Sequence, residues 1–265
     1  MLEGAEIVLS AVSMKGVRAV VTQLQSLPLS LETIFVTATK GLDPATTWTP
    51  SAIWQAAFPA HPVVVLSGPN LSKEIQQELP AATVVASSVA AAAEAVQAVF
   101  SSSLFRVYTN PDPLGVELGG TLKNVIAIAA GVCDGLQLGT NAKAALVTRG
   151  LMEMVRIGNS WGAKTETFYG LSGLGDLLAT CNSPLSRNYQ VGYQLAQGKT
   201  LADTLALLEG TAEGVNTTHV LIQRAIQQRI SVPITAQVYR LLQNDITPRQ
   251  ALEALMLRDI KPERG

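Results

Sequence analysis

The sequence has few cysteines and few histidines, and this scarcity argues against a fold stabilised by a disulfide framework or by a zinc site. Two cysteines, Cys133 and Cys181, occur in 265 residues, which indicates a reducing compartment and no framework of disulfides. A single disulfide between them stays open, but two buried thiols are the interpretation we favour. The two histidines lie far from both cysteines in sequence, so the chain lacks the ligand spacing of a zinc site.

Charge is also scarce. Charged residues make up 15% of the chain and the net charge is −1, so there is no electrostatic footprint for nucleic acid or an anionic membrane. The N-terminus lacks the basic segment that opens a secretory signal. The most apolar stretch, 83–100, carries Glu94 and Gln97 and is too polar for a membrane span. We therefore expect a cytoplasmic protein.

A third absence concerns one arrangement of glycines. A dinucleotide-binding sheet normally opens with a strand followed by G-x-G-x-x-G at the start of a helix, where the backbone approaches the pyrophosphate. The chain does not contain this pattern. The partial match Gly173-Leu174-Gly175 follows no predicted strand. Because the first predicted strand begins at Ile7, we expect the first strands and the glycine loop of such a sheet to lie outside this chain.

Five short apolar runs in the first part of the chain are typical of strands buried on both faces. They cover residues 7–12, 33–38, 63–66, 83–86 and 105–108. Helical stretches lie between them, most clearly over 17–27 and 89–101. This alternation predicts an α/β fold with an incomplete doubly wound, Rossmann-like parallel sheet. We assign residues 1–112 to a partial dinucleotide-binding domain.

After residue 113 the pattern predicts helices alone, and we assign residues 113–265 to an all-helical catalytic and substrate domain. Thr200 and Thr247 have the residue type of helix N-caps, and Gln250 completes a capping box with Thr247. The predicted helices cover 115–131, 142–161, 187–197, 201–208, 217–229, 234–243 and 248–257.

The helix predicted over 115–131 is apolar nearly all round and should be buried. It nevertheless carries Lys123 and Asn124 in its middle, and a buried ammonium is costly unless it is paired or used. Lys123 either takes part in chemistry or extends along its stem to the surface, and the pattern favours neither. Gly119 and Gly120 make sense if something approaches the backbone closely there.

Two further segments follow predicted strands. Lys40 stands in Thr37-Ala38-Thr39-Lys40-Gly41, at the carboxyl end of a strand, where ligands bind in open α/β sheets. Ser67-Gly68-Pro69-Asn70 has the same place after the next strand. Taken alone, the first is also the pattern of a solvated loop lysine and the second that of an ordinary turn.

A glycine-rich segment, 170–188, holds two more candidate groups. Asp176 follows a glycine turn, where an acid also commonly satisfies free helix amides. Ser186-Arg187-Asn188 combines a helix start with a guanidinium, which suits a phosphate dianion. The alternative for these three residues is a serine cap followed by a surface arginine.

Together these segments resemble the NAD(P)-dependent glycerol-3-phosphate dehydrogenase family of bacterial type, in the right order along essentially the whole chain. The most specific parts are 117–131, 134–135, 141–146 and 170–188. Thr39-Lys40-Gly41 and Ser67-Gly68-Pro69 are less specific but correctly placed.

The resemblance implies roles for individual residues and a cofactor, NAD or NADP. The implied catalytic residues are Lys123, as proton donor or acceptor at the substrate oxygen, with Lys40 and Asp176. The implied substrate-binding residues are Lys40, Gly68, Asn70, Lys123, Asn124, Asp176, Thr180, Ser186, Arg187 and Asn188. The implied cofactor-binding residues are Lys40, Ser72, Arg187 and Glu213.

The implied reaction reduces dihydroxyacetone phosphate to sn-glycerol 3-phosphate for glycerophospholipid synthesis. An ammonium near the ketone oxygen stabilises the developing charge and supplies a proton. A second cation would lower the pKa of Lys123 while Asp176 would raise it, so the sequence leaves the net direction open.

Two positions depart from the family pattern, and two other functions stay open. Asn70 replaces the usual Ser or Thr after Gly-Pro, and Thr140 replaces the Asp that often precedes Asn141. Without the glycine loop, the chain is alternatively a truncated inactive homologue or an interaction module. A related hydroxyacid or 6-phosphogluconate-type dehydrogenase shares the same two-domain plan. The expected partner is a small phosphate substrate, and the resemblance allows a homodimer.

Overall fold

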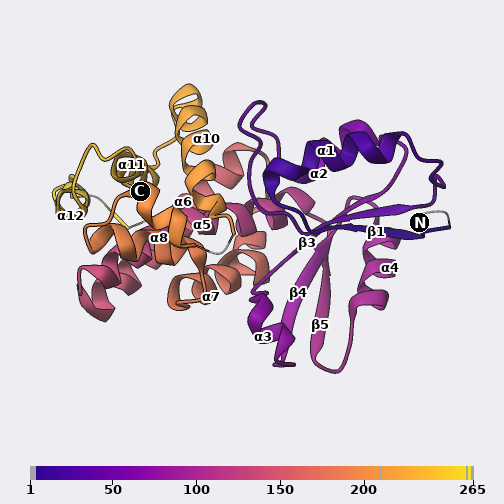
Figure 1. Ribbon diagram of the computed structural model, residues 1–265, viewed down its shortest axis with the longest axis horizontal. Helices are drawn as coiled ribbons and strands as arrows, with labels where there is room; N and C mark the ends of the chain where they lie inside the picture. The colour runs from indigo at the N-terminus through magenta and orange to yellow at the C-terminus, as the bar shows by residue number, and fades with distance from the viewer. Residues whose placement is uncertain (1–3, 209, 261, 264–265) are drawn as a thin grey trace.

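The computed structural model describes residues 4–208, 210–260 and 262–263. It consists of two parts that lie side by side (Figure 1). Residues 4–110 contain strands and helices and are called the α/β half here. The residues from 113 onward contain helices alone and are called the helical half. The change falls at the expected position, while the interpretation of the two halves as separate domains stays a prediction.

The α/β half is built on a five-stranded sheet in the order β1-β2-β3-β4-β5. All five predicted strands are present: β1 (Ile7–Ser10), β2 (Ile34–Thr37), β3 (Val63–Ser67), β4 (Ala81–Ala86) and β5 (Phe105–Asn110). The expectation of a parallel sheet needs one correction, because β4 runs antiparallel to β3. The segment between them contains only the short helix α3 (Ser72–Gln76) and does not cross a face of the sheet, so the chain returns in the opposite direction.

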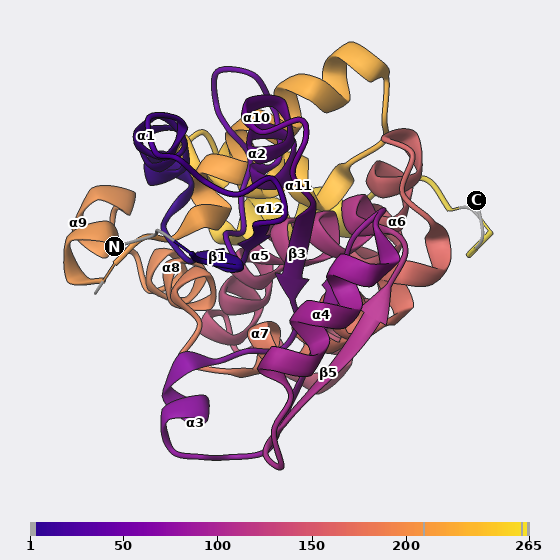
Figure 2. The same ribbon diagram turned by 90° about the vertical axis from the view of Figure 1, so that its right-hand side faces the viewer.

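Helices cover both faces of this sheet, as a doubly wound fold requires. On one face α1 (Met14–Gln25) and α2 (Pro50–Ala57) pack on β2, where Phe35 stacks on Trp54 with ring centroids 5.0 Å apart. On the other face α4 (Ala90–Phe100) packs through Val96 (Figure 2). The sequence patterns did not predict α2 or α3, which are both short.

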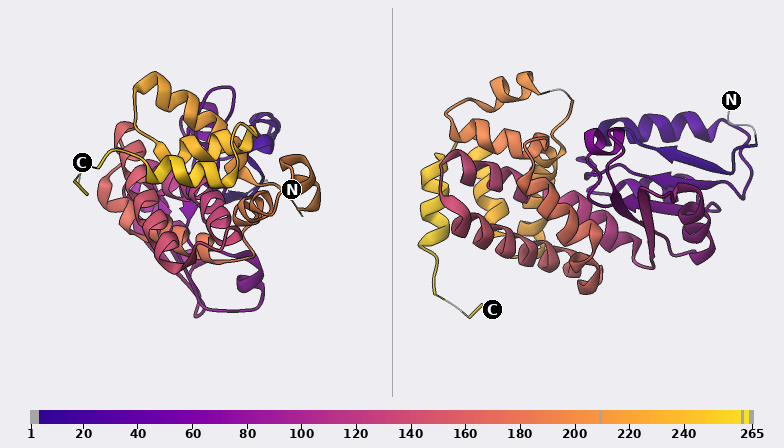
Figure 3. Two further views of the ribbon diagram at one scale, coloured as in Figure 1. Left: turned by 90° about the vertical axis from the view of Figure 1, so that its left-hand side faces the viewer. Right: turned by 90° about the horizontal axis from the view of Figure 1, so that it is seen from below.

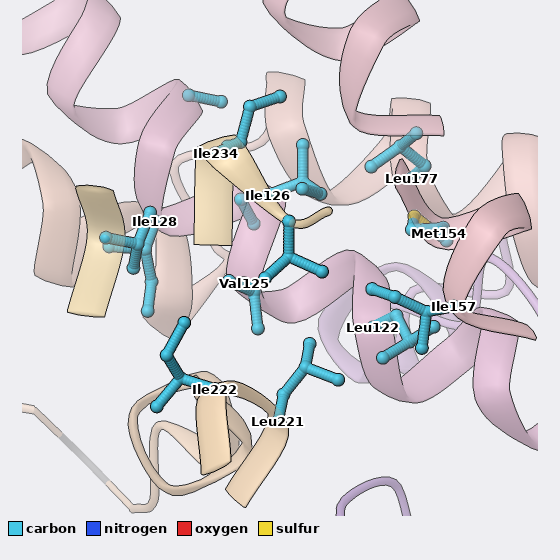
Figure 4. Packing of buried hydrophobic residues seen from close by; sticks show 14 of the residues in the cluster. Leu122, Val125, Ile126, Ile128, Met154, Ile157, Leu177, Leu221, Ile222 and Ile234 are labelled. Carbon is cyan, nitrogen blue, oxygen red and sulfur yellow. The ribbon is translucent and has the colours of Figure 1, made fainter. Parts of the chain in front are cut away.

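The helical half surrounds one long helix, α5 (Pro113–Gly135), as Figure 3 shows from two sides. Apolar side chains of α5, including Leu122 and Ile126, meet those of surrounding helices in one buried cluster (Figure 4). The other helices are α6 (Gly139–Ser160), α7 (Asp176–Asn182), α8 (Arg187–Ala196), α9 (Leu201–Leu207), α10 (Glu213–Gln228), α11 (Pro233–Leu242) and α12 (Pro248–Met256), with a 3-10 turn at Thr165–Tyr169 and a π turn at Leu171–Gly175.

Details of the helical half confirm several predictions. Thr200 and Thr247 cap α9 and α12, and the capping box with Gln250 is present. Cys133 and Cys181 are both free and buried, as favoured. α5 is long and apolar enough to cross a membrane, but 94% of its most apolar window is buried inside the fold, so here it is the central core helix.

Candidate active site

Lys123 is buried in the middle of α5, and its side chain is only 8% exposed. Its ammonium therefore does not extend to the surface, and that alternative is wrong. Nζ of Lys123 donates to Oδ1 of Asp176 at 2.8 Å and to Oγ1 of Thr180 at 2.5 Å. Both partners lie on the same face of α7, since they are four residues apart. The structure thus pairs the buried charge that the sequence singled out.

Lys40 reaches the same carboxylate from the α/β half. It follows β2, and its Nζ donates to Oδ2 of Asp176 at 2.5 Å and to the carbonyl oxygen of Gly68 at 3.1 Å. Asp176 is 2% exposed and makes no cap contact with the α7 amides, contrary to the alternative weighed for an acid at a helix start. Two ammonium groups therefore share one buried carboxylate at the junction of the two halves.

Burial and neighbouring charges shift the two titrating groups of this cluster. Burial of the Lys123 ammonium lowers its pKa to about 8, against the opposing influence of Asp176, while Lys40 lowers it further. Burial alone would raise the pKa of Asp176, but the charges of Lys123 and Lys40 outweigh it and hold that pKa below its usual range. The direction that the sequence left open for Lys123 is therefore downward.

The paired glycines of α5 admit close neighbours, as their position in a buried helix suggested. A Cβ added to Gly119 would lie 2.7 Å from the carbonyl oxygen of Ser172, and one on Gly120 would meet the Ser67 hydroxyl and lie 3.3 Å from Cε of Lys40. These neighbours are parts of the protein itself. The glycines let the turn before Asp176 and the turn after β3 approach the helix that carries Lys123.

The Ser186-Arg187-Asn188 segment begins α8 beside α5. Ser186 caps the helix by accepting from the Tyr189 amide at 3.2 Å, and Arg187 is exposed. Asn188 is 8% exposed, and its Oδ1 accepts from the Gly214 amide at 2.9 Å. A Cβ at Gly214 would lie 2.7 Å from both Asn188 Oδ1 and the Asn124 carbonyl oxygen, so these residues converge next to Lys123 on α5.

The turn after β3 contacts the lysine cluster through the carbonyl oxygen of Gly68, which accepts from Lys40. Asn70 donates to the Thr83 hydroxyl at 2.8 Å, and its buried Oδ1 has no partner in the part of the chain that the structure describes. Ser72 is exposed in α3. No hydrogen bond among the described residues connects Ser72 with either lysine.

Glu213, at the start of α10, contacts the α/β half. Its Oε1 accepts from the Met14 amide at 3.2 Å and so caps the N-terminus of α1, where Ser13 provides no side-chain cap. A carboxylate therefore already stands at the positive end of α1. That helix end is not suited to a pyrophosphate, in agreement with the absence of glycines from its turn.

The sequence reasoning missed a buried carboxylate on α5. Glu117 is 2% exposed and accepts from the amide and the hydroxyl of Ser51 at 2.8 and 2.5 Å, so it holds the start of α2. Burial raises the pKa of Glu117 to about 7. The available signal was a glutamate within an apolar helix, the same signal that singled out Lys123.

Comparison with known proteins adds a family to this geometry. Residues 1–93 match the model for the N-terminus of NAD-dependent glycerol-3-phosphate dehydrogenase, and residues 112–253 match the model for its C-terminus. The chain belongs to the NAD-dependent glycerol-3-phosphate dehydrogenase family. The proposed resemblance, the enzyme class and the NAD(P) cofactor are thereby confirmed.

Individual members of the glycerol-3-phosphate dehydrogenase family cover nearly all of the chain. The glycerol-3-phosphate dehydrogenase [NAD(P)+] of Nostoc sp. is 80% identical over 262 residues, which are 99% of this chain and 85% of the relative. That of Gloeobacter violaceus is 57% identical over 264 residues, 100% of this chain and 87% of the relative. A crystal structure of glycerol-3-phosphate dehydrogenase from Coxiella burnetii aligns with a TM-score of 0.92 and 37% identity, over 97% of this chain and 78% of that one.

The wider group of solved dehydrogenases shares only the fold with this chain. D-mandelate dehydrogenase aligns with a TM-score of 0.54 at 9% identity, and a ketopantoate reductase from Ralstonia eutropha with 0.52 at 13%. Membership of the glycerol-3-phosphate dehydrogenase family therefore overturns the alternative of a related hydroxyacid dehydrogenase.

Proposed function

We propose that Lys123, Lys40 and Asp176 form the catalytic centre of an sn-glycerol-3-phosphate dehydrogenase that reduces dihydroxyacetone phosphate with NADH or NADPH. The observation that carries the proposal is the buried Lys123 ammonium, with a pKa of about 8, which shares the carboxylate of Asp176 with Lys40. A proton donor works best when its pKa lies near the operating pH. The family supports the reaction, and the geometry supports the assignment of the residues.

Lys123 is the proton donor in this proposal. When the ketone carbon gains a hydride, its oxygen gains negative charge and needs a proton. The Lys123 ammonium delivers one of its three protons from Nζ to that oxygen and becomes a neutral amine. Burial favours this step because it already disfavours the charged form of the lysine. In the reverse direction the neutral amine accepts the proton from the alcohol.

Lys40 and Asp176 orient and balance this proton donor. Asp176 holds both ammonium groups and fixes the rotamer of Lys123, with Thr180 as a second acceptor. Lys40 supplies the positive charge that remains after Lys123 has lost its proton, and so stabilises the oxygen through the transfer. Its side chain is 23% exposed, which leaves it accessible to a substrate.

The substrate phosphate is assigned to the start of α8. Helix α8 has ten residues, and free amides and the positive end of the helix dipole favour an anion at its N-terminus. The exposed Arg187 adds a guanidinium that can hold two phosphate oxygens at once. Ser186, Asn188 and Asn124 are assigned to the same end of the substrate, with Gly68 and Asn70 at the turn after β3.

The residues present suit the nicotinamide end of a dinucleotide. The carboxyl ends of β1 to β3, where ligands bind in open sheets, lie on the side of the helical half (Figure 1). Ser10, Thr37 and Ser67 each bring to these ends a buried hydroxyl without a partner among the described residues. We assign Lys40, Ser72, Arg187 and Glu213 to the cofactor. The cofactor supplies the hydride when bound, and the protein supplies orientation and charge.

Four further expectations go with this function and remain proposals. The product is a precursor for glycerophospholipids, so we assign the enzyme to lipid synthesis. The two free, buried cysteines favour a cytoplasmic location, and the family resemblance favours a small phosphate compound as partner. A homodimer is a prediction of the family resemblance, and sedimentation of the purified chain measures it.

Turnover by the purified 265-residue chain tests the proposal. We expect oxidation of NADH or NADPH that depends on dihydroxyacetone phosphate, and calorimetric binding of that substrate at a single site. Binding of dihydroxyacetone phosphate without turnover would favour the truncated, inactive homologue. Failure to bind both dihydroxyacetone phosphate and the nicotinamide cofactor would favour an interaction module. Glyoxylate with NADH or NADPH, and 6-phosphogluconate with NAD+ or NADP+, serve as control substrates that should not be consumed.

A further inference from the structure

The segment that carries Lys40 is held on both sides. Ala38 and Thr39 donate to the carbonyl oxygens of Ser10 and Val12 in the α/β half at 2.9 and 2.8 Å, and the residues after Lys40 are held by the helical half. The amide of Gly41 donates to Oγ1 of Thr121 on α5 at 3.1 Å. Nδ2 of Asn216 on α10 donates to the carbonyl oxygen of Leu42 at 2.9 Å. The Leu42 side chain is fully buried in the hydrophobic cluster that α5 organises. Two hydrogen bonds and one apolar anchor thus cross the junction within two residues of Lys40.

Close packing at Gly41 leaves little room for this segment to shift. A Cβ at Gly41 would lie 3.2 Å from Cβ of Met14 and 3.4 Å from Oε2 of Glu213, and its φ of +145° is one that favours glycine. The backbone next to Lys40 therefore lies between α1 and α10. Thr121, whose hydroxyl accepts from the Gly41 amide, is fully buried on α5, two residues before Lys123.

We propose that Thr121 and Asn216 are positioning residues for the reaction, because they clip the Lys40 segment onto α5 and α10 and so fix where the two lysines meet Asp176. The proposal rests on the proposed function, since it takes Lys40 and Lys123 as the acting groups. α5 sets the position of Lys123 directly and that of Lys40 through the Thr121 hydroxyl. A lysine on a loop otherwise keeps many rotamers, so the clip orders it before substrate binds.

A purely structural role for Thr121 makes a different prediction. In that case its hydroxyl only satisfies a buried amide, and its loss lowers stability alone. If the clip positions Lys40, its loss also changes the charges that Lys123 faces. These are the charges of Asp176 and Lys40, beside the neutral Cys181 thiol and the Thr180 hydroxyl. Withdrawal of Lys40 removes an influence that lowers the pKa of Lys123, so that pKa should rise.

The experiment measures the pKa of Lys123 by NMR of isotope-labelled lysine side chains in the full chain. Thr121→Val removes the hydroxyl at nearly constant shape, and Thr121→Ser restores it. Lys40→Gln gives the reference for complete loss of the Lys40 charge. Thr204→Val is the matched control, because Thr204 is also fully buried but donates only within α9.

We expect Thr121→Val to raise the pKa of Lys123 in the direction of Lys40→Gln and to remove the exchange protection of the Gly41 amide. Turnover should fall about ten- to a hundredfold while KM for dihydroxyacetone phosphate changes little, because misplacement affects the reacting geometry most. Thr121→Ser should restore all three properties, and Thr204→Val should leave them unchanged.

The proposal is overturned if Thr121→Val melts earlier but keeps the Lys123 pKa and the turnover of the unaltered chain. Should Thr121→Val not fold, Asn216→Ala decides in the same way, because Asn216 lies only partly buried on the surface of α10. The NMR and exchange measurements need no turnover. If Thr121→Val shifts the pKa of Lys123 but the unaltered chain has no activity, the positioning role of Thr121 stands and only the proposed function is refuted.

Discussion

The two lysines that share Asp176 come from regions of opposite character. Lys123 lies on α5, a helix buried along most of its length, and its side chain is 8% exposed. Lys40 lies in residues 38–48, a segment without regular structure between β2 and α2, and its side chain is 23% exposed. One carboxylate thus joins the buried core helix to a connecting loop.

The charges of these two regions respond differently to the fold. On α5, burial favours the neutral form of both groups. It lowers the pKa of Lys123 to about 8 and raises the pKa of Glu117 to about 7. In the loop, the Arg18 guanidinium holds the pKa of Asp43 below its usual range despite partial burial. Burial therefore prepares a proton donor on the helix, whereas the loop contributes charges that remain charged.

The largest effect that separates the two regions is expected from Lys123→Met. The substitution removes the proton donor and leaves Asp176 paired with Lys40, so the fold should persist. We expect kcat to fall about a thousandfold, within the range of general acid catalysis. The free energy of unfolding should change little, because burial already disfavours the charged form of Lys123, as its lowered pKa shows, and Asp176 keeps Lys40 as a partner.

Lys143→Met is the matched control for this prediction. Lys143 also pairs with an aspartate, Asp134, at 2.6 Å, but its side chain is 18% exposed and lies outside the site. Its loss should change kcat less than about threefold. Equal losses of kcat in the two variants, measured by NAD(P)H oxidation with urea unfolding in parallel, would remove Lys123 from the catalytic centre.

Residue patterns singled out the part of the site that lies on α5. A lysine in the middle of an apolar helix conflicts with the pattern around it, and such local conflicts mark functional sites. The paired glycines before Lys123 carried the same kind of signal. The five strands were equally readable, because strands buried on both faces are continuous apolar runs.

The partners of Lys40 and Lys123 could not be predicted from local patterns in the same way, because tertiary structure sets these contacts. Asp176 lies 53 residues after Lys123 and 136 after Lys40, and no pattern encodes such pairs. Glu117 and Ser51 meet across 66 residues. The reversed strand β4 and the short helix α2 depend likewise on packing that local propensity does not contain.

A second prediction concerns the pH dependence of stability on the helix side. Glu117 has a pKa of about 7 when folded, against about 4.3 in an unfolded chain. Between these values the folded state binds more protons, so the stability contributed by Glu117 falls as pH rises and is lost above about pH 7. The loss is at most about 4 kcal/mol.

Glu117→Gln should remove this slope, because glutamine stays neutral at every pH. Urea unfolding at several pH values between about 4.5 and 8 measures the slope for both proteins. Glu94→Gln is the control, since Glu94 is exposed on α4 and should leave the slope unchanged. A slope that survives in Glu117→Gln would assign the pH dependence to another group, and Glu153, whose pKa burial also raises, is the next to replace.

The smallest effect is expected in the loop, from Asp43→Asn. Asp43 pairs with Arg18 at 2.7 Å, but the Arg18 side chain is 48% exposed, so the pair should contribute at most about 1 kcal/mol. Because its folded pKa is lowered, this stability is present above about pH 4 and lost as pH falls through the folded pKa. Thermal unfolding at neutral pH and near pH 3 measures the difference from the unaltered chain.

The same variant sharpens the comparison between helix and loop. Asp43 follows Leu42 directly and also holds Thr46 through its amide and hydroxyl, so it shapes the loop without touching α5. If Thr121 and Asn216 position Lys40, Asp43→Asn should change kcat less than about twofold, because both contacts to the helices remain. A loss of kcat as large as that of Thr121→Val would instead assign the positioning of Lys40 to the internal structure of the loop.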